Sequence, residues 1–305
     1  MTTNISIIIT YYNQPESIDI VMKSLENQVN VNKSNIEVVI VDDGSKYKKR
    51  LQINHSELKI KYVELDKNRG RSKARNSGAN VSEGSLLIFI DGDRFASPNF
   101  INSHIQSHKN SNEKIVIGDI IEVFSSDIGL YKTSISNMFE DKKDIIWKYT
   151  RRYNYADIVF NIFDSQGHSF TSYSWISMFS GNFSIPKELF KKLEGFDSNF
   201  LNWGMENIEF GYRAYKNNVA IEFNPKAVNF HIYHKANRKN STNLHTFLNK
   251  YNNDNKINKY LKFVNSEISL YDLDPQKLSP NLKKIYYDNN KLGPRYDFTT
   301  FLRSC

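Results

Sequence analysis

The chain has 305 residues, of which 39% are hydrophobic, and its 20 Phe and 18 Tyr supply enough bulky side chains for a sizeable core. It carries 41 Lys and Arg against 33 Asp and Glu, a formal net charge of +8 at pH 7. This balance excludes an acidic, disordered chain and favours an anionic partner, such as a nucleic acid, a phosphorylated small molecule or an anionic lipid. The single cysteine, Cys305, excludes an intrachain disulfide framework and a zinc-ribbon site.

Targeting and membrane signals are absent from the sequence. Residues 1–6 lack the basic region and long apolar run of a signal peptide. No stretch approaches the roughly 18 uncharged apolar residues of a membrane-spanning helix. We therefore expect a cytoplasmic protein.

Strand and helix signals alternate over the first 125 residues. Short runs of β-branched and other apolar residues predict strands over 5–10, 36–41, 60–65, 86–90 and 115–123. Between them, apolar residues at helical spacing predict helices over 15–28 and 71–81. Strands that alternate with helices predict an α/β fold with a mostly parallel sheet and helices on both faces.

The second half of the chain is less regular. Periodicity is lost over residues 127–177, where we expect loops. Order returns with helices predicted over 186–193 and 205–217 and a strand over 219–223. Beyond residue 235 the chain is rich in Asn and Lys, with helical patches at 244–264 and 281–287. We therefore predict a domain over residues 1–240 and a helical appendage over 241–305.

Three polar clusters follow predicted strands: Tyr11–Asn13, Asp42–Asp43 and Asp91–Asp93. Ligands of an open α/β sheet bind outside the carboxyl ends of its strands, so these clusters are expected to share one site. Two carboxylates at 91 and 93 in a basic protein suit a divalent cation that bridges them to a diphosphate. The alternative is that they cap the following helix.

The phosphate-binding glycine loops of nucleotide-binding proteins are absent. A bound nucleotide would therefore depend on other groups, and the basic residues Arg69, Arg71, Lys73 and Arg75 are candidates for its phosphates. A solvated helix face is the alternative for some of them, because residues two apart on a helix cannot all face one ligand.

Motifs in the second half carry a sharper signal: SGN at 180–182, GFD at 195–197, WGMENIEFGYR at 203–213 and HIYH at 231–234. With YN at 12–13, DDGS at 42–45, ARNSG at 74–78 and DGD at 91–93, residues 3–240 resemble a family 2 glycosyltransferase with the GT-A (Rossmann-like) fold. WGMENIE resembles the acceptor-side motif of β-galactosyltransferases, chondroitin-polymerase-like domains and polypeptide N-acetylgalactosaminyltransferases. HKANRKN at 234–240 resembles the metal-histidine segment of galactosyltransferases.

The resemblance implies a donor site in residues 1–125 and an acceptor half in 126–240. Asp42 or Asp43 would hydrogen-bond the uracil or ribose of a UDP-sugar, with Tyr11 packed nearby and Arg75 close to the nucleotide. Asp91 would hold the ribose or the donor sugar. The donor substrate implied is therefore a UDP-sugar.

The resemblance also implies a metal site. Asp93 would ligate Mn²⁺ or Mg²⁺, and His234, with His231, would complete the ligand shell. Imidazole ligands favour Mn²⁺ over Mg²⁺, although a packing or capping role is the alternative for each histidine. His104 and His108 lie four apart on a predicted helix without a neighbouring acid, and we interpret them as part of a surface face.

On the acceptor side, Glu206 is the candidate base for the acceptor hydroxyl. Asn182 and Trp203 are candidate sugar contacts, Trp203 by stacking on a pyranose ring, with an ordinary core role as its alternative. The galactosyltransferase pattern has Asp after this Glu, whereas Asn207 stands here, as in the retaining N-acetylgalactosaminyltransferases. Glu206 and Asn207 are thus the catalytic candidates, and of inverting and retaining chemistry we favour inversion.

The predicted function is metal-dependent transfer of a hexose or N-acetylhexosamine from a UDP-sugar to a glycan, lipid-linked oligosaccharide or peptide. A sugar-phosphate nucleotidylyltransferase would need a Gly-rich, Arg-containing loop after the first strand, which residues 11–15 lack. A non-enzymatic binder of anionic surfaces or nucleic acid and an inactive homologue are further alternatives. Residues 235–262 hold seven Lys or Arg against one acid, which predicts peripheral contact with an anionic membrane at its inner face. Nucleic acid is disfavoured because no reading element is evident.

Overall fold

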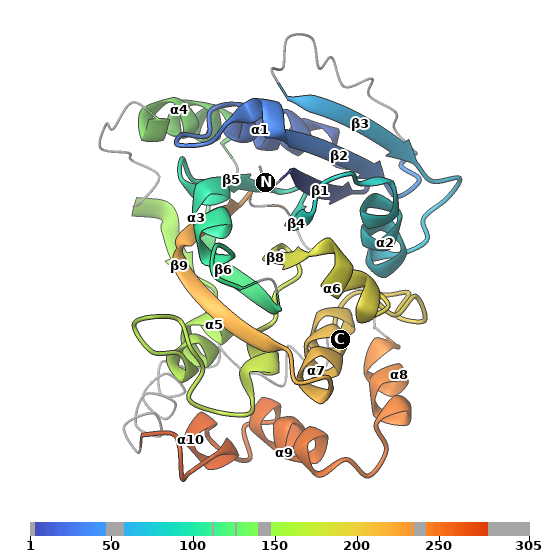
Figure 1. The fold of residues 1–305 in the computed structure, drawn as a ribbon, viewed down its shortest axis with the longest axis vertical. Coiled ribbons are helices and arrows are strands. Elements are labelled where there is room, and N and C mark those ends of the chain that lie inside the picture. Colours follow the sequence, from blue (N-terminus) through green and yellow to red (C-terminus); the bar gives the residue numbers. More distant parts are fainter. Residues whose placement is uncertain are drawn as a thin grey trace.

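The computed structural model describes residues 4–46, 58–111, 113–125, 127–139, 148–232, 234 and 242–279. These residues build a mixed sheet of nine strands in the order β3-β2-β1-β4-β8-β6-β9-β5, with β7 paired to β6 (Figure 1). The predicted helical patch at 281–287 lies outside the described residues.

The strands of the N-terminal part pair in parallel, as predicted. They are β1 (Ile5–Tyr11), β2 (Ile36–Asp42), β3 (Lys59–Glu64) and β4 (Leu86–Asp91). Their parallel register brings the carboxyl ends of β1, β2 and β4 to one edge, where Tyr11 lies opposite Asp42 and Thr10 opposite Asp91. This edge positions the polar clusters found in the sequence.

The rest of the sheet has mixed direction. β6 is parallel to β9, whereas β8 is antiparallel to β4 and β6, β5 to β9, and β7 to β6. The bounds are β5 (Arg94–Ala96), β6 (Lys114–Val123), β7 (Thr150–Arg152), β8 (Asn182–Pro186) and β9 (Ala220–His231). The α/β class is confirmed, and the parallel arrangement is that of the first four strands together with the β6–β9 pair. The expected strand at 219–223 extends to His231, which brings the histidine motif to the end of β9.

Helices cover both faces of the sheet because alternate strand residues point to opposite sides. Ile7 and Ile9 of β1 pack in one cluster with α1 (Pro15–Glu26) and α3 (Phe100–Ser107). Ile8 packs in another cluster with α2 (Arg71–Val81), α6 (Lys187–Lys192) and α7 (Glu206–Lys216). Burial on both faces explains why β1 reads as a continuous apolar run rather than an alternating one.

The segment expected to form loops contains short helices. α4 (Ile128–Phe139) buries Tyr131 and Ile135 against β5 and β9, and α5 (Asn154–Val159) contributes Tyr155 and Val159 to the main core. No helix among the described residues combines the length and apolar character needed to cross a bilayer.

The C-terminal helices α8 (Asn243–Lys250), α9 (Asn255–Val264) and α10 (Leu270–Leu273) lie beyond α7 at one end of the molecule (Figure 1). Phe247, Tyr260 and Phe263 belong to the same buried cluster as the sheet and α7. Residues 242–279 therefore share a core with the preceding domain, and the division at residue 240 stays a prediction.

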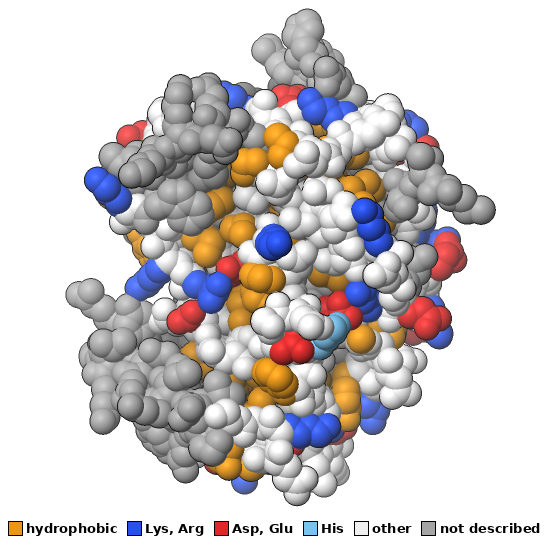
Figure 2. Space-filling view, turned by 60° about the vertical axis from the view of Figure 1, so that its left-hand side comes forward, with side chains coloured by type: hydrophobic (Ala, Val, Ile, Leu, Met, Phe, Trp, Pro, Cys, Tyr) orange, Lys and Arg blue, Asp and Glu red, His pale blue; other side chains and the backbone are white. Residues whose placement is uncertain are grey.

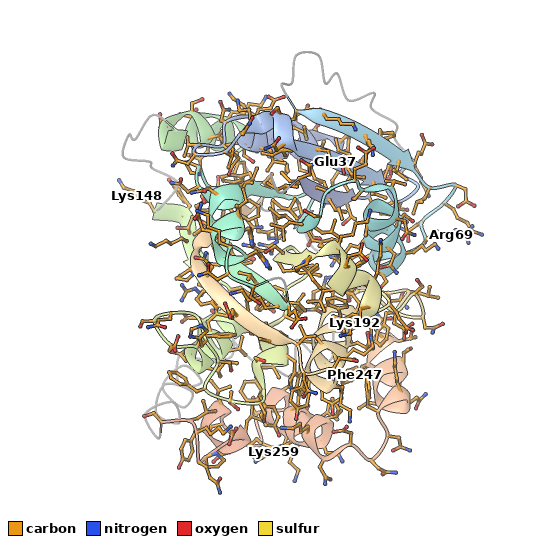
Figure 3. All side chains as sticks on the ribbon, viewed as in Figure 1. Glu37, Arg69, Lys148, Lys192, Phe247 and Lys259 are labelled. Atoms are coloured by element: carbon orange, nitrogen blue, oxygen red, sulfur yellow. The ribbon has the colours of Figure 1, made fainter. Side chains whose placement is uncertain are left out.

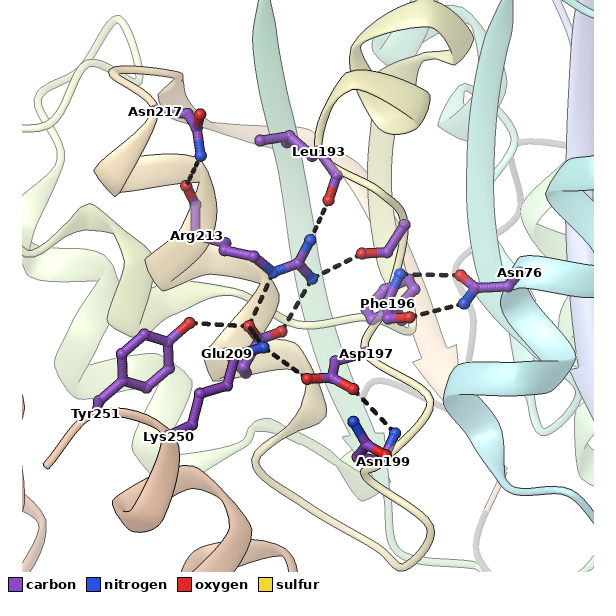
Figure 4. A network of polar contacts seen from close by, with 11 residues as sticks. Asn76, Leu193, Phe196, Asp197, Asn199, Glu209, Arg213, Asn217, Lys250 and Tyr251 are labelled. Carbon is purple, nitrogen blue, oxygen red and sulfur yellow. Dashed lines mark hydrogen bonds and ion pairs between the residues drawn. The ribbon is translucent and has the colours of Figure 1, made fainter.

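A polar network ties α8 to α7 (Figure 4). The buried carboxylate of Glu209 accepts hydrogen bonds from Arg213 Nε at 2.8 Å, from Lys250 Nζ at 2.9 Å and from the Tyr251 hydroxyl at 2.9 Å. Burial alone would raise the pKa of Glu209, but the cationic donors Arg213 and Lys250 hold it below its ordinary value. Lys250 also bonds Asp197, so the network holds the loop that leads into α7.

Candidate active site

A cavity of about 640 Å³ lies at the carboxyl edge of the parallel strands. A larger groove of about 880 Å³ lies between α3 and β9, but its ionic groups include the paired Lys114 and Glu222, and none of the candidate residues lines it. We take the smaller cavity as the candidate active site because most of the predicted residues converge there. Those that line it are Tyr11, Asp43, Asp91, Asp93, Trp203, Glu206, Asn207, His231 and His234.

The structure brings the three candidate metal ligands together. One ligand atom each of Asp93, His231 and His234 lies within 4.8 Å of the others. Asp93 Oδ2 is 3.1 Å from His234 Nε2 and 3.5 Å from His231 Nε2. Burial would raise the pKa of Asp93, but hydrogen bonds from the two histidines bring it well below its ordinary value. One carboxylate and two imidazoles fit a transition-metal ion such as Mn²⁺ better than Mg²⁺, which prefers oxygen ligands.

A buried arginine holds two residues of the cavity wall. Arg75 on α2 is 1% exposed, and its Nη2 is 2.8 Å from Asp91 Oδ1 while its Nη1 is 3.3 Å from Glu206 Oε1. The guanidinium also lies over the Phe196 ring. Burial would lower the pKa of Arg75, but the two carboxylates raise it. Arg75 itself does not line the cavity but holds two residues that do, and its closeness to the nucleotide stays a prediction.

Glu206 is the first residue of α7 and follows a tight turn. Gly204 and Met205 have φ angles of 90° and 67°, in the left-handed region, which is rare for a residue such as Met. Glu206 is 3% exposed, and its Oε2 has no hydrogen-bond partner among the described residues. A buried carboxylate oxygen in the cavity wall that receives no hydrogen bond from a described residue is suited to accept a proton. Asn207 beside it donates a hydrogen bond to the Met178 carbonyl and leaves its own amide oxygen for other donors.

Of the paired aspartates, Asp43 is the one that lines the cavity. Asp43 accepts hydrogen bonds from the backbone N–H groups of Arg69 and Gly70, and burial raises its pKa. Asp42 is fully buried, and its oxygens accept from the Tyr11 and Tyr62 hydroxyls and the Ser45 N–H. The alternative of Asp42 as the nucleotide contact is therefore corrected in favour of Asp43.

Asn182 is not a sugar contact. It is fully buried, and its amide donates to the carbonyls of Asp119 at 2.8 Å and Ala227 at 2.9 Å. Its Oδ1 accepts from His104 Nε2 at 3.0 Å. Asn182 therefore joins β6, β8 and β9 inside the sheet, and the prediction of a sugar contact was wrong.

The surface assignment of the two helix histidines was also wrong. His104 is 0% and His108 7% exposed, and both contact the Ser184 hydroxyl, each at 2.9 Å. Burial lowers the pKa of His104 to about 3 and that of His108 to about 4. Both imidazoles are neutral at physiological pH and form part of a buried hydrogen-bond chain. The sequence pattern could not reveal this burial because the polar partner of both histidines, Ser184, lies on β8, a strand that was not predicted.

Two further residues line the cavity: Arg71, a candidate for the nucleotide phosphates in the sequence, and Glu122, which sequence reasoning did not single out. Arg71 is the basic residue of the 69–75 run that reaches the cavity, whereas Arg69 pairs with Asp66 at the edge of the molecule (Figure 3). Glu122 on β6 accepts a hydrogen bond from His231 Nδ1 at 2.6 Å. Only the register between distant strands could have placed Glu122 here.

On the face drawn in Figure 2, basic and acidic side chains are interspersed, so the net charge of +8 forms no single patch there.

The comparisons with known proteins place the α/β sheet and its acidic cavity in the class of glycosyltransferases. The chain matches glycosyl transferase family 2 over residues 6–193, and the N-terminal domain of galactosyltransferase over residues 165–235. The chain belongs to glycosyl transferase family 2. The resemblance found in the sequence is thereby confirmed, and the nucleotidylyltransferase and non-enzymatic alternatives are set aside.

One relative is validoxylamine A glucosyltransferase of Streptomyces hygroscopicus subsp. limoneus, 27% identical over 236 residues. The match covers 71% of this chain and 49% of that protein, so the chain spans about half the length of this relative. The GalNAc-T7 structure with UDP, GalNAc and Mn²⁺ has a TM-score of 0.61 at 17% identity, covering 94% of this chain and 54% of that one. S. aureus TarS in complex with UDP-GlcNAc has a TM-score of 0.54 at 18% identity, covering 76% and 59%. These likenesses establish the GT-A fold.

Proposed function

We propose that this protein is a metal-dependent, inverting glycosyltransferase that moves a hexose or N-acetylhexosamine from a UDP-sugar to a hydroxyl of a glycan, lipid-linked oligosaccharide or peptide. One observation carries the proposal: the Asp93, His231 and His234 ligand atoms and the unpartnered Glu206 oxygen belong to the wall of one cavity. UDP with Mn²⁺ in GalNAc-T7 and UDP-GlcNAc in TarS, proteins that share the fold, support the choice of donor and metal.

The chain supplies the groups that hold the donor. Asp93, His231 and His234 would hold Mn²⁺, which offsets the charge that develops on the departing UDP. Asp91, which Arg75 holds at 2.8 Å, would accept hydrogen bonds from ribose or sugar hydroxyls. Asp43 remains as the acceptor for the uracil or ribose.

Glu206 supplies the proton transfer. As the acceptor oxygen forms its bond to the anomeric carbon, the bond from that carbon to the UDP phosphate oxygen breaks and UDP leaves with the electron pair. The acceptor proton passes to Glu206 Oε2, the oxygen to which no described residue donates a hydrogen bond. Trp203, half-buried in the cavity wall, is the aromatic side chain on which we expect a pyranose to stack.

The predicted contact of residues 235–262 with an anionic membrane gains little support from the described lysines. Lys250 is held by Asp197 and Glu209, and Lys259 donates to the Leu273 carbonyl. Lys256 donates to the Ser172 hydroxyl at 2.6 Å. Residues 235–240, which hold the other basic residues of the segment apart from Lys262, lie outside the described part of the chain.

The decisive experiment is a panel of UDP-sugars with Mn²⁺ and release of UDP as the readout, since hydrolysis without acceptor already ranks the donors. We expect release with at least one UDP-hexose or UDP-N-acetylhexosamine, and its loss in the presence of a chelator. Failure of every UDP-sugar to bind in calorimetry with Mn²⁺ present would contradict the proposal.

A further inference from the structure

Glu122 lies outside the metal-ligand group but touches it. On β6 it is the direct cross-strand partner of His231 on β9, and His231 is in turn the partner of Arg94 on β5. The side chains of the three residues are 13–21% exposed. The strand register therefore places a carboxylate, an imidazole and a guanidinium side by side at the cavity.

The two carboxylate oxygens of Glu122 are both engaged. Oε2 accepts from His231 Nδ1 at 2.6 Å, and Oε1 accepts from Arg94 Nη2 at 3.2 Å. The carboxylate of Glu122 is thereby fixed in orientation between an imidazole and a guanidinium.

We propose that Glu122 is a positioning residue of the metal site, which holds the proton of His231 on Nδ1 so that the lone pair of Nε2 faces the cation. The inference rests on the proposed function, because it gives His231 a role as a ligand. A histidine whose one nitrogen donates to a carboxylate presents its other nitrogen to the metal as a more basic and better oriented ligand.

The alternative roles of Glu122 fit the geometry less well. As a direct ligand it would have to release His231 or Arg94, since each takes one of its oxygens. As a simple ion-pair partner of Arg94 it would not need the shorter 2.6 Å bond to His231. Arg94 offsets the charge of Glu122, which leaves the charge of Asp93 for the cation.

Metal-free protein gives a direct readout of the proton position. His231 Nδ1 is 2.6 Å from Glu122, whereas Nε2 is 3.5 Å from Asp93, so Glu122 wins the competition for the single proton of the neutral ring. In Glu122→Gln the charged competitor is lost, and the proton should move to Nε2 and toward Asp93. Long-range ¹H–¹⁵N NMR, recorded at alkaline pH so that the ring is neutral, distinguishes the two tautomers. A purely structural role for Glu122 would not produce this exchange.

Metal affinity is the second readout, measured as free Mn²⁺ by electron paramagnetic resonance without donor sugar. We expect Glu122→Gln to bind Mn²⁺ roughly 10–100-fold more weakly than the unmodified protein. Glu122→Asp, which keeps the charge but shortens the reach, should also bind more weakly. Glu222→Gln is the matched control, because Glu222 lies on the same sheet, is 19% exposed and pairs with Lys114 outside the metal site.

The outcomes separate the two levels of the argument. If the unmodified protein binds Mn²⁺, Asp93→Ala does not, and Glu122→Gln retains both its affinity and the Nδ1–H tautomer, the role of Glu122 is overturned and the metal site stands. If the unmodified protein and Asp93→Ala fail alike to bind Mn²⁺, the metal dependence of the proposed function falls and the role of Glu122 with it. Weaker binding together with the exchange of tautomers supports the inference.

Discussion

Replacing Glu206 by Gln tests the proposed base most directly. In this variant the amide oxygen can keep the place of Oε1 against Arg75, while the amide nitrogen replaces Oε2, the oxygen without a described partner. A neutral amide cannot take the proton of the acceptor hydroxyl. A general base typically contributes about 10²–10⁴ in rate, or about 3–5 kcal/mol of barrier, so we expect kcat to fall by that factor.

The fold should survive this change. Arg75 is 2.8 Å from Asp91 but 3.3 Å from Glu206, so its shorter ion pair remains. Loss of one charge from a buried pair whose hydrogen bond is retained should lower the free energy of unfolding by about 1–3 kcal/mol. The KM for the donor should change little, because the donor-side carboxylate Asp91 keeps its orientation.

The assay is steady-state UDP release with saturating acceptor, together with a thermal melt of each protein. Glu37→Gln is the matched control, because Glu37 on β2 is also buried, at 6% exposed, and is not part of the cavity wall (Figure 3). A kcat for Glu206→Gln within tenfold of the unmodified enzyme, with Glu37→Gln unchanged, would refute Glu206 as the base. A similar fall in both variants would show instead that loss of a buried carboxylate is the cause.

Three further predictions follow from the same geometry. Asp93→Ala should remove Mn²⁺-dependent UDP release and leave the melting temperature within a few degrees, as measured by activity and by a melt without metal. Asn182→Ala should leave the donor KM unchanged but lower the free energy of unfolding by about 2–4 kcal/mol in urea titrations, because it strands two buried carbonyls. Stability should fall with pH below about 6.5, since the folded pKa values of His104 and His108, about 3 and about 4, lie below the unfolded value of 6.5. Each histidine contributes about 1.4 kcal/mol per pH unit to this fall in the free energy of unfolding. Urea midpoints between about pH 5 and 7 would measure the slope, and His108→Gln should make it less steep.

The features predictable from the sequence are those that follow from local pattern. Buried apolar runs gave the parallel strands, and parallel strands that share an edge bring Asp43, Asp91 and Asp93 to one cavity whatever the rest of the fold does. The helix that begins at Glu206 is likewise local, whereas the strand predicted over 219–223 continues to His231 in the structure. The metal ligands and the candidate base were expected from the resemblance of their motifs to those of glycosyltransferases, not from local pattern alone.

The features that could not be predicted depend on contacts between distant segments. Adjacent residues at a strand end point in different directions, so sequence alone does not tell that Asp42 is bonded by Tyr62 while Asp43 lines the cavity. Asn182 lies beside a site motif, but its partners are carbonyls 45 and 63 residues away in the chain. Glu122 lies at the site only because the register of β6 with β9 pairs it with His231.

Arg75 shows why a residue can be part of a site motif without contacting the ligand. It comes from α2, and Glu206, 131 residues further along, comes from α7. One buried guanidinium thereby joins the carboxylate that would hold the donor to the carboxylate that would deprotonate the acceptor. A shift of about 1 Å between reacting groups can cost on the order of a hundredfold in rate. Because both carboxylates are bonded to one buried guanidinium, the donor and the base would keep their relative positions. The two motifs that contain these residues, ARNSG at 74–78 and WGMENIE at 203–209, are in this sense a single structural unit.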